Sequence, residues 1–421
     1  MECIERSKIK LKPYQKKIIY FMNSKKNNGL LVVHPTGTGK TLTAVTYSQC
    51  FLEKNFNQKV IFIGPASLLT NFRKTLEDYG VTDRRDYKLY SYQKFLNDQK
   101  KIDCEDNLLI IDEVHNLRNF SGARQKAALL CANKAKKILL LTATPFMNDL
   151  ADFIPLINLV HGYTIITKKS QVSHVSYLKR YLRGKVDFIS KSDKGEDFPK
   201  YKEHFIDIRM PKDYEKIYCK LIKGQTVNMT SFSSPRAFYN AHRRAVNKIG
   251  HDSKYFSLKM NKTIKIIKNY KSVIFSNWLE FGLEPITDAL DEKGITNMSF
   301  SGRITQKNKD KIIKDFNENK FQVLIISGSG KEGLDLKGVR KLIVMDPVWN
   351  YSGMEQIKGR TVRYRSHIDL PPSERTVDIY YLILVTDNKK CISGDSVVYK
   401  FIESKKQLQT YVDKTLKEIS I

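Results

Sequence analysis

The chain has 421 residues, enough for two domains of ordinary size; 41% of them are hydrophobic and 28% are charged. This composition is typical of globular proteins and excludes a largely disordered chain. Lys and Arg number 73 against 44 Asp and Glu, which gives a formal net charge of +29. Such an excess favours a polyanionic partner such as nucleic acid, and a lysine-rich solvated surface is the alternative.

The N-terminal residues and the cysteines bear on the compartment. The opening MECIERSKIKLKPYQ is too polar for a signal peptide, and no apolar run approaches the roughly 18 residues that cross a membrane. The six cysteines lie far apart and form no C-x-x-C pair. The sequence therefore predicts neither a zinc site nor a disulfide framework, and it favours a soluble, intracellular protein in a reducing compartment.

Short apolar runs, each bounded by turn residues and followed by a helical pattern, recur in both halves of the chain. Continuous runs of this length are typical of strands that are buried on both faces of a parallel sheet. We therefore predict an α/β fold with two lobes, each a mostly parallel sheet flanked by helices. The predicted strands are Gly29–Val33, Val60–Ile63, Leu108–Ile111 and Ile138–Leu141, then Val273–Phe275, Val323–Ile326, Leu342–Met345 and Ile379–Val385.

Between the predicted lobes, the chain becomes basic and rich in Tyr and Ser, with few apolar runs. We predict a mostly helical connector or insertion in this part. Its clusters Lys179-Arg180-Tyr181 and His242-Arg243-Arg244 fit a solvated face as well as a contact with DNA. Trp278 and Trp349 fit packing as well as base stacking. The expected domains are 1–166, 167–262, 263–390 and a helical segment, 391–421.

The segment HPTGTGKT, His34–Thr41, lies between an apolar run and a helical pattern. Glycines let such a loop point its backbone N–H groups at phosphate oxygens, and the following helix adds the positive end of its dipole. Lys40 is placed to reach the β- and γ-phosphates, and the Thr41 hydroxyl to bind Mg²⁺. The generic pattern has Gly where this chain has His34. The predicted nucleotide-binding residues here are Pro35, Thr36, Gly37, Thr38, Gly39, Lys40 and Thr41.

A second motif, IIDEVH at Ile110–His115, ends another apolar run. In a parallel sheet, a carboxylate at this strand end lies at the edge where ligands bind. Asp112 is expected to hold Mg²⁺ through water, and Glu113 to orient and deprotonate the attacking water. A solvated acidic turn is the alternative for an isolated motif of this kind, but the upstream phosphate loop argues against it.

Further segments follow in a consistent order and resemble the motifs of superfamily 2 helicases, in the style of Swi/Snf remodellers. These segments are KPYQ (Lys12–Gln15), VIFIGPASLLTNFRKTL (Val60–Leu76), ILLLTATPFMNDLADFIPLINLV (Ile138–Val160), SVIFSNWLEFGLEPITDAL (Ser272–Leu290), LIISGSGKEGLDLKGVRKLIVMDPVWN (Leu324–Asn350) and EQIKGRTVRYRSH (Glu355–His367). Two segments indicate a more specific resemblance within this superfamily: VVHPTGTGKT, and the GR-x-x-R-x-x-SH segment before ERTVDIYYLIL. They resemble ATPases of large DNA viruses, of the poxvirus nucleoside triphosphatase I and early transcription factor small subunit type. The resemblance implies two RecA-like lobes.

The same resemblance implies roles for individual residues. Gln15 would recognise adenine, and Arg360 and Arg363, expected one helical turn apart on one face, would reach the γ-phosphate as arginine fingers. Gln356 and His115 would link the nucleotide state to the grip on nucleic acid. A relay between ATP and the nucleic-acid backbone is implied for Gly333, Asp335, Thr142 and Thr144, with a tight turn at the glycine and strand-end packing of the threonines as alternatives.

The expected activity is hydrolysis of ATP with Mg²⁺, stimulated by DNA. We expect a translocase or helicase that acts on double-stranded DNA in viral transcription or DNA metabolism, in a viral factory of the host cytoplasm or in the virion. One alternative is a transcription-factor subunit whose lobes bind DNA and dock partners such as RNA polymerase. The other is an RNA-directed ATPase or helicase.

Overall fold

The computed structural model describes residues 2–146, 149–172, 174–190, 197–222, 240–247, 258–302, 304–328, 334–348 and 351–421. The chain divides into two compact units. Unit 1 comprises Met1–Lys194 and Gln407–Ile421, and unit 2 comprises Gly195–Lys406. The segment predicted as a connector is therefore shared between the two units. None of the helices in the described ranges is long and apolar enough to span a membrane.

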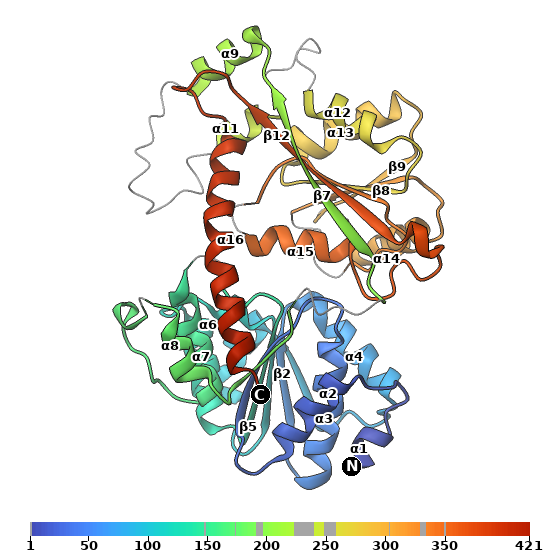
Figure 1. Cartoon of the computed structure of the whole chain (residues 1–421). Coiled ribbons are helices and arrows are strands. Elements are labelled where there is room, and N and C mark those ends of the chain that lie inside the picture. The colour runs from blue at the N-terminus through green and yellow to red at the C-terminus, as the bar shows by residue number, and fades with distance from the viewer. Residues whose placement is uncertain are drawn as a thin grey trace. The chain divides into compact units, whose positions relative to one another are not determined.

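Unit 1 is built on a sheet with helices on both faces (Figure 1). The sheet is parallel and has six strands in the order β3-β2-β4-β5-β1-β6. Its strands are β1 (Gly29–Val33), β2 (Val60–Gly64), β3 (Tyr87–Ser91), β4 (Leu108–Asp112), β5 (Lys137–Thr142) and β6 (Val186–Phe188). Its helices are α1 (Glu2–Glu5), α2 (Pro13–Asn23), α3 (Lys40–Lys54), α4 (Ala66–Tyr79), α5 (Tyr92–Asp98), α6 (Ala123–Lys134), α7 (Phe153–His161) and α8 (Ser176–Leu182).

The central strands of unit 1 are buried along their whole length, because helices cover both faces of the sheet. Successive residues alternate between the two faces: Leu30 packs with α2, α3 and α4, whereas Leu31 packs with α5, α6, α7 and α8. Continuous apolar runs are therefore required in these strands. The parallel arrangement brings the carboxyl ends of β1, β4 and β5 to one edge of the sheet.

Unit 2 repeats this architecture with a second six-stranded parallel sheet, in the order β7-β12-β11-β8-β10-β9. Its strands are β7 (Lys200–Arg209), β8 (Ser272–Ser276), β9 (Asn297–Phe300), β10 (Val323–Ser327), β11 (Lys341–Val344) and β12 (Thr376–Val385). Its helices are α9 (Lys212–Ile222), α11 (Asn240–Ala245), α12 (Leu258–Ile267), α13 (Glu284–Asp291), α14 (Gln306–Asn317), α15 (Tyr351–Thr361) and the start of α16 (Gly394–Ile419). The expected α/β fold with two sheets flanked by helices is confirmed.

Helix α16 contributes to the cores of both units. Val398 and Ile402 pack in unit 2 against β8, β10 and β12, whereas Val412, Leu416 and Ile419 pack in unit 1 against the face covered by α7 and α8. Helix α16 lies within the predicted C-terminal segment, and its last part is a component of the first unit.

The prediction that the cysteines form no disulfide framework is wrong. All six are paired, as Cys3–Cys50, Cys104–Cys131 and Cys219–Cys391, with Cα–Cα distances of 5.1, 5.3 and 5.8 Å. The partners are 47, 27 and 172 residues apart in the chain. Only the fold brings them together, so sequence spacing gave no signal. Because all six cysteines are paired, they no longer favour a reducing compartment.

Candidate functional site: a phosphate loop and its supports

The phosphate loop connects β1 to α3, and its conformation depends on glycine. Gly37 and Gly39 have φ angles of 83° and 78° in the left-handed region, and Gly39 is the N-cap of α3. A Cβ atom on Gly39 would lie 2.6 Å from Gln15 Nε2, so the Gln15 side chain would have to move away from the loop. The loop therefore leads directly into the N-terminus of a helix, where phosphate binding is favoured.

Two side chains of α2 donate hydrogen bonds to the backbone of the phosphate loop. The Tyr14 hydroxyl donates to the carbonyl of Thr38 at 2.8 Å, and Gln15 Nε2 donates to the carbonyl of Gly39 at 3.1 Å. Gln15 Oε1 also accepts from the Lys12 amide at 2.8 Å. Recognition of adenine by Gln15 stays a prediction, and the structure adds a role in supporting the loop. Tyr14 was not singled out from the sequence.

Lys40 lies at the start of α3 and folds over its own loop. Its Nζ donates to the carbonyls of His34 at 2.9 Å and Pro35 at 3.2 Å. The Thr38 hydroxyl closes the same turn by donating to the Pro35 carbonyl at 2.8 Å. Thr36, Gly37, Lys40 and Thr41 are half-buried, and Gly39 is exposed. The loop therefore places the Lys40 ammonium group and backbone amides together at the N-terminus of α3.

Asp112 and Glu113 end β4, and the structure places two carboxylates next to each other there. Asp112 is buried, and its Oδ1 accepts from the Glu113 amide at 2.9 Å. Burial, and next the charge of Glu113, raise the pKa of Asp112 to about 7, against the lowering effect of Lys40. A buried carboxylate that is destabilised in this way fits a divalent cation, and Thr41 at the start of α3 offers a hydroxyl oxygen for the same ion.

The turn at Glu113 is unusual for a residue with a side chain. Its φ of 50° lies in the left-handed region. The buried Tyr92 hydroxyl donates to the carbonyl of Asp112 at 2.7 Å and lies 3.0 Å from that of Glu113, so α5 holds both ends of the turn. No sequence motif marks Tyr92, so it was not among the predicted site residues.

Strand β5 lies between β1 and β4 and connects the two motifs. The His34 amide donates to the carbonyl of Thr142 at 3.1 Å. His115 Nδ1 lies 3.1 Å from Thr142 Oγ1 and 3.3 Å from Glu113 Oε2. The Thr144 amide donates to Thr142 Oγ1 at 3.0 Å. The structure therefore brings together His115, Thr142 and Thr144, the residues that were expected to couple nucleotide state to nucleic acid.

The predicted arginines lie in unit 2, and one expectation about them is wrong. Arg360 is on α15, but the helix ends at Thr361, so Arg363 is in the following turn rather than on the same helical face. The Arg363 amide donates to Ser366 Oγ at 3.3 Å, which fixes that turn. Arg363 Nε lies 3.3 Å from Asp335 Oδ1.

Of Gln356, Gly333 and Trp349, only Gln356 lies within the described residues. Gln356 lies within α15, where it is half-buried. Gly333 lies outside the described residues, as does Trp349.

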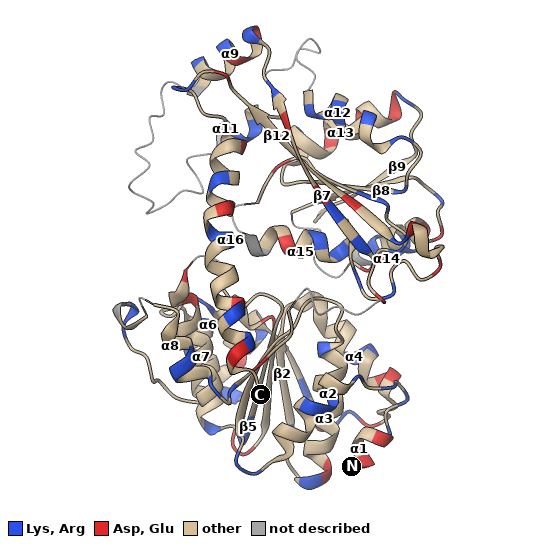
Figure 2. Ribbon diagram, in the orientation of Figure 1, with Lys and Arg blue, Asp and Glu red and all other residues tan. Residues whose placement is uncertain are grey.

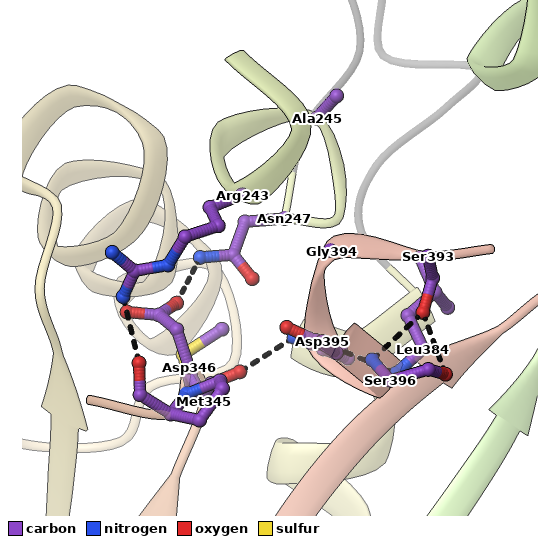
Figure 3. A network of polar contacts seen from close by, with 12 residues as sticks. Arg243, Ala245, Asn247, Met345, Asp346, Leu384, Ser393, Gly394, Asp395 and Ser396 are labelled. Atoms are coloured by element: carbon purple, nitrogen blue, oxygen red, sulfur yellow. Dashed lines mark hydrogen bonds and ion pairs between the residues drawn. The ribbon is translucent and has the colours of Figure 1, made fainter. Parts of the chain in front are cut away.

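A buried polar network holds the carboxyl ends of β8 and β11 in unit 2 (Figure 3). Asp346 accepts from the Ser276 hydroxyl at 3.0 Å and the Asn277 amide at 2.6 Å, and Asn247 also donates to it. Lys259 Nζ donates to the Met345 carbonyl at 2.6 Å and pairs with Asp395 at 2.5 Å. These links connect α11, α12 and the start of α16 to the carboxyl ends of β8 and β11.

The basic clusters of the predicted connector have structural partners. Arg243 is 5% exposed, donates to the Pro347 carbonyl at 2.7 Å and lies 5.3 Å from the centre of the Trp278 ring. Exposed Arg244 lies 5.0 Å from the same ring. Lys179 pairs with Glu418 at 2.7 Å. Neither a fully solvated face nor a DNA contact describes Arg243; it supports the fold, with Trp278 packed beside it.

The expectation of a mostly helical connector was also incomplete. Helices α8, α9, α11 and α12 are present, but β6 and β7 come from the same stretch and extend the two sheets. Both strands lie at sheet edges.

Comparisons with known proteins agree with this geometry. Residues 8–147 match the family model for the res subunit of type III restriction enzymes, residues 81–273 the SNF2-related domain, and residues 258–365 the helicase conserved C-terminal domain. The fold is similar to the Hef helicase domain of Pyrococcus furiosus, with a TM-score of 0.55 at 18% identity over 93% of this chain and 97% of that one.

Relatives match the chain over most of its length. A protein of Acanthamoeba polyphaga mimivirus, named as a candidate ATP-dependent RNA helicase, is 31% identical over 98% of this chain and 97% of its own length. Nucleoside triphosphatase I of Choristoneura biennis entomopoxvirus is 25% identical over 95% of this chain and 77% of its own. The chain therefore belongs to the superfamily 2 helicases, nucleic-acid-acting ATPases, and carries an SNF2-related domain.

Proposed function

We propose that this protein is a DNA-dependent ATPase that translocates along double-stranded DNA. The observation that carries the proposal is the line of contacts from the phosphate loop through Thr142 to His115 and Glu113. This line joins the residues that would bind ATP to the residues that would sense its hydrolysis. A protein that only bound nucleotide would not need that connection.

The residues of unit 1 can bind and orient the triphosphate. Loop amides and Lys40 bind phosphate oxygens, and Thr41 and Asp112 would hold Mg²⁺. When bound, the ion neutralises charge on the β- and γ-phosphates. Glu113 orients the attacking water and accepts its proton, and His115, 3.3 Å away, holds the Glu113 carboxylate in place.

Unit 2 supplies positive charge for the transition state. We assign this role to Arg360 and Arg363, with Gln356 on the same helix as Arg360 reading the nucleotide state. The ion pair between Arg363 and Asp335 is half-exposed, so its exchange for a phosphate oxygen costs little.

Charge and family support DNA as the track. The net charge is +29, and Lys and Arg occur on helices of both units (Figure 2). The match of residues 81–273 to the SNF2-related domain is the basis on which we propose duplex DNA rather than single strands. Two relatives, described above, come from a mimivirus and an entomopoxvirus, which supports a role in the transcription or DNA metabolism of a large DNA virus.

Steady-state ATPase rates test this function most simply. The rate is measured without nucleic acid and with duplex DNA, single-stranded DNA and RNA, for the wild type, Lys40→Ala and Glu113→Gln. We expect strong stimulation by duplex DNA that both variants lose. A rate that no nucleic acid changes, or that the variants retain, would contradict the motor.

RNA is the second candidate track, because the mimivirus relative is named for an RNA helicase. In the same assay, stimulation by RNA well above that by duplex DNA would replace the proposed track and leave the ATPase chemistry intact. The two outcomes are distinct, since each nucleic acid is tested separately.

A further inference from the structure

A buried acidic side chain that no motif includes contacts the first residue of the phosphate loop. Asp187 lies in the middle of β6, the edge strand beside β1, and is 1% exposed. Its Oδ2 lies 2.7 Å from Nε2 of His34, which is also 1% exposed. Lys17 on α2 donates to Asp187 Oδ1 at 2.9 Å. A buried charge with two partners of this kind is a fixed part of the site.

The protonation states of this pair follow from its surroundings. Burial lowers the pKa of His34, which outweighs the raising effect of Asp187. Burial alone would raise the pKa of Asp187, but the hydrogen bond and charge of His34, with those of Lys17, lower it overall. His34 is therefore a neutral imidazole that donates Nε2–H to an ionised carboxylate.

His34 is the residue through which the loop is fixed to the sheet. Its amide donates to Thr142 on β5, and its carbonyl accepts from Lys40 Nζ at 2.9 Å. Its ring contacts Tyr14, with the ring centres 5.6 Å apart. The imidazole thus anchors the residue whose backbone amide holds the loop to β5 and whose carbonyl accepts from the ammonium group that would bind phosphate.

We propose that Asp187 is a positioning residue for ATP binding: it orients His34, and His34 holds the phosphate loop and Lys40 in the geometry that accepts a triphosphate. This inference rests on the proposed nucleotide site. It explains why the chain has His where the generic loop has Gly, because an imidazole reaches the edge strand and glycine cannot.

The strand that carries Asp187 is itself held by the residues after α16. The Phe188 amide donates to Ser420 Oγ at 2.9 Å, and the Ile421 amide donates to the Val186 carbonyl at 3.0 Å. Ser420 Oγ also lies 3.4 Å from Asp187 Oδ1. The outer edge of β6 is therefore paired, which keeps the carboxylate at a fixed distance from His34.

Equilibrium binding of a fluorescent ATP analogue tests the proposal without any nucleic acid. The variants are Asp187→Ala, Asp187→Asn, which keeps a hydrogen-bond acceptor of the same size, and the matched control Asp378→Ala. Asp378 also pairs with His204 at 2.9 Å, on strands of unit 2 outside the ATP-binding residues, although this pair is partly exposed. Melting temperatures establish that each variant is folded.

We expect Asp187→Ala to weaken nucleotide binding about 10- to 100-fold, the range for loss of a hydrogen bond to a charged group. Asp187→Asn should recover most of the affinity, and Asp378→Ala should match the wild type. In steady-state assays, the loss should raise KM more than it lowers kcat. If a double variant with Asp187→Ala and His34→Ala binds nucleotide no more weakly than His34→Ala alone, Asp187 acts through His34.

A folded Asp187→Ala protein with wild-type affinity overturns the proposal. If Asp187→Ala does not fold, His34→Phe removes the same hydrogen bond from the other side and keeps the ring, and its affinity decides in the same way. Lys40→Ala distinguishes a wrong role for Asp187 from a wrong assignment of the nucleotide site. Unchanged binding in Lys40→Ala would mean that the nucleotide site itself is wrong, whereas lost binding there with normal binding in Asp187→Ala refutes only the role of Asp187.

Discussion

At the scale of single residues, the carboxylates at the end of β4 determine what the site can do. Glu113 adopts a left-handed backbone conformation, which costs about 1–3 kcal/mol for a residue with a side chain. Tyr92 offsets part of this cost through its hydrogen bond to the Asp112 carbonyl and its contact with that of Glu113. Glu113, the proposed general base, therefore owes its position to a tyrosine outside the IIDEVH motif.

Removal of the Tyr92 hydroxyl should slow ATP hydrolysis and leave ATP binding nearly unchanged. We expect Tyr92→Phe to lower kcat about 10- to 100-fold, because a displaced general base loses its geometry, with little change in ATP affinity. Tyr87→Phe is the control, since the Tyr87 hydroxyl contacts Ser48 and Gln49 instead. Equal kcat values for the two variants would refute the role of Tyr92.

Neutralisation of Asp112 should stabilise the protein while it abolishes hydrolysis. The raised pKa of about 7 means that ionised Asp112 opposes folding when no cation is bound. In magnesium-free buffer, Asp112→Asn should raise the Tm, and by more above pH 7 than below it, where the wild-type carboxyl is already protonated. Calorimetry measures both values; a lower Tm for the variant at every pH would contradict the assignment.

The motif residues could be read from the sequence, but their supports could not. Lys40 and Asp112 belong to local patterns whose spacing has a chemical meaning. Tyr14, Tyr92 and Asp187 act through partners 24, 20 and 153 residues away, and only the fold makes those contacts.

At the scale of secondary structure, the sequence revealed the centres of the sheets and missed their edges. Each predicted apolar run is a strand, usually one or two residues longer than expected. The four strands that were missed, β3, β6, β7 and β9, are the edge strands of the two sheets. Three of them are partly exposed along their length, so they lack the continuous apolar run that marks a strand buried on both faces. The remaining strand, β6, is only three residues long.

The end of helix α16 should be essential to the stability of unit 1. Leu416 is fully buried in the core beside α7 and α8. Leu416→Ala should lower the free energy of unfolding by about 2–5 kcal/mol, the usual result of a large-to-small change in a core. Urea unfolding measures the change, and Tyr411→Ala on the same helix, at a side chain 67% exposed, is the control. Equal stability of the two variants would mean that the end of α16 does not belong to the core.

At the scale of the whole molecule, disulfides connect distant parts of the chain within each unit. Cys3–Cys50 and Cys104–Cys131 lie in unit 1, and Cys219–Cys391 closes a loop of 172 residues in unit 2. A cross-link that closes a long loop stabilises the fold mainly by restricting the unfolded chain.

Reduction of these bonds should therefore lower the Tm. Loss of Cys219–Cys391 alone, in a Cys219→Ser, Cys391→Ser double variant, should cost about 5 kcal/mol in the chain-entropy account. Thiol titration of the unfolded, unreduced wild type should find no reactive cysteine, and differential scanning calorimetry compares stabilities. Six titratable thiols in freshly purified protein would contradict the pairing.

The central claim is that ATP hydrolysis moves this protein along duplex DNA, and displacement of a third strand from a blunt-ended triplex measures that movement directly. We expect the wild type to release the third strand only with hydrolysable ATP, Glu113→Gln to release none, and the underlying duplex to stay paired. ATP-dependent separation of the duplex strands would instead indicate a helicase. A protein that hydrolyses ATP on DNA but never displaces the third strand would contradict translocation.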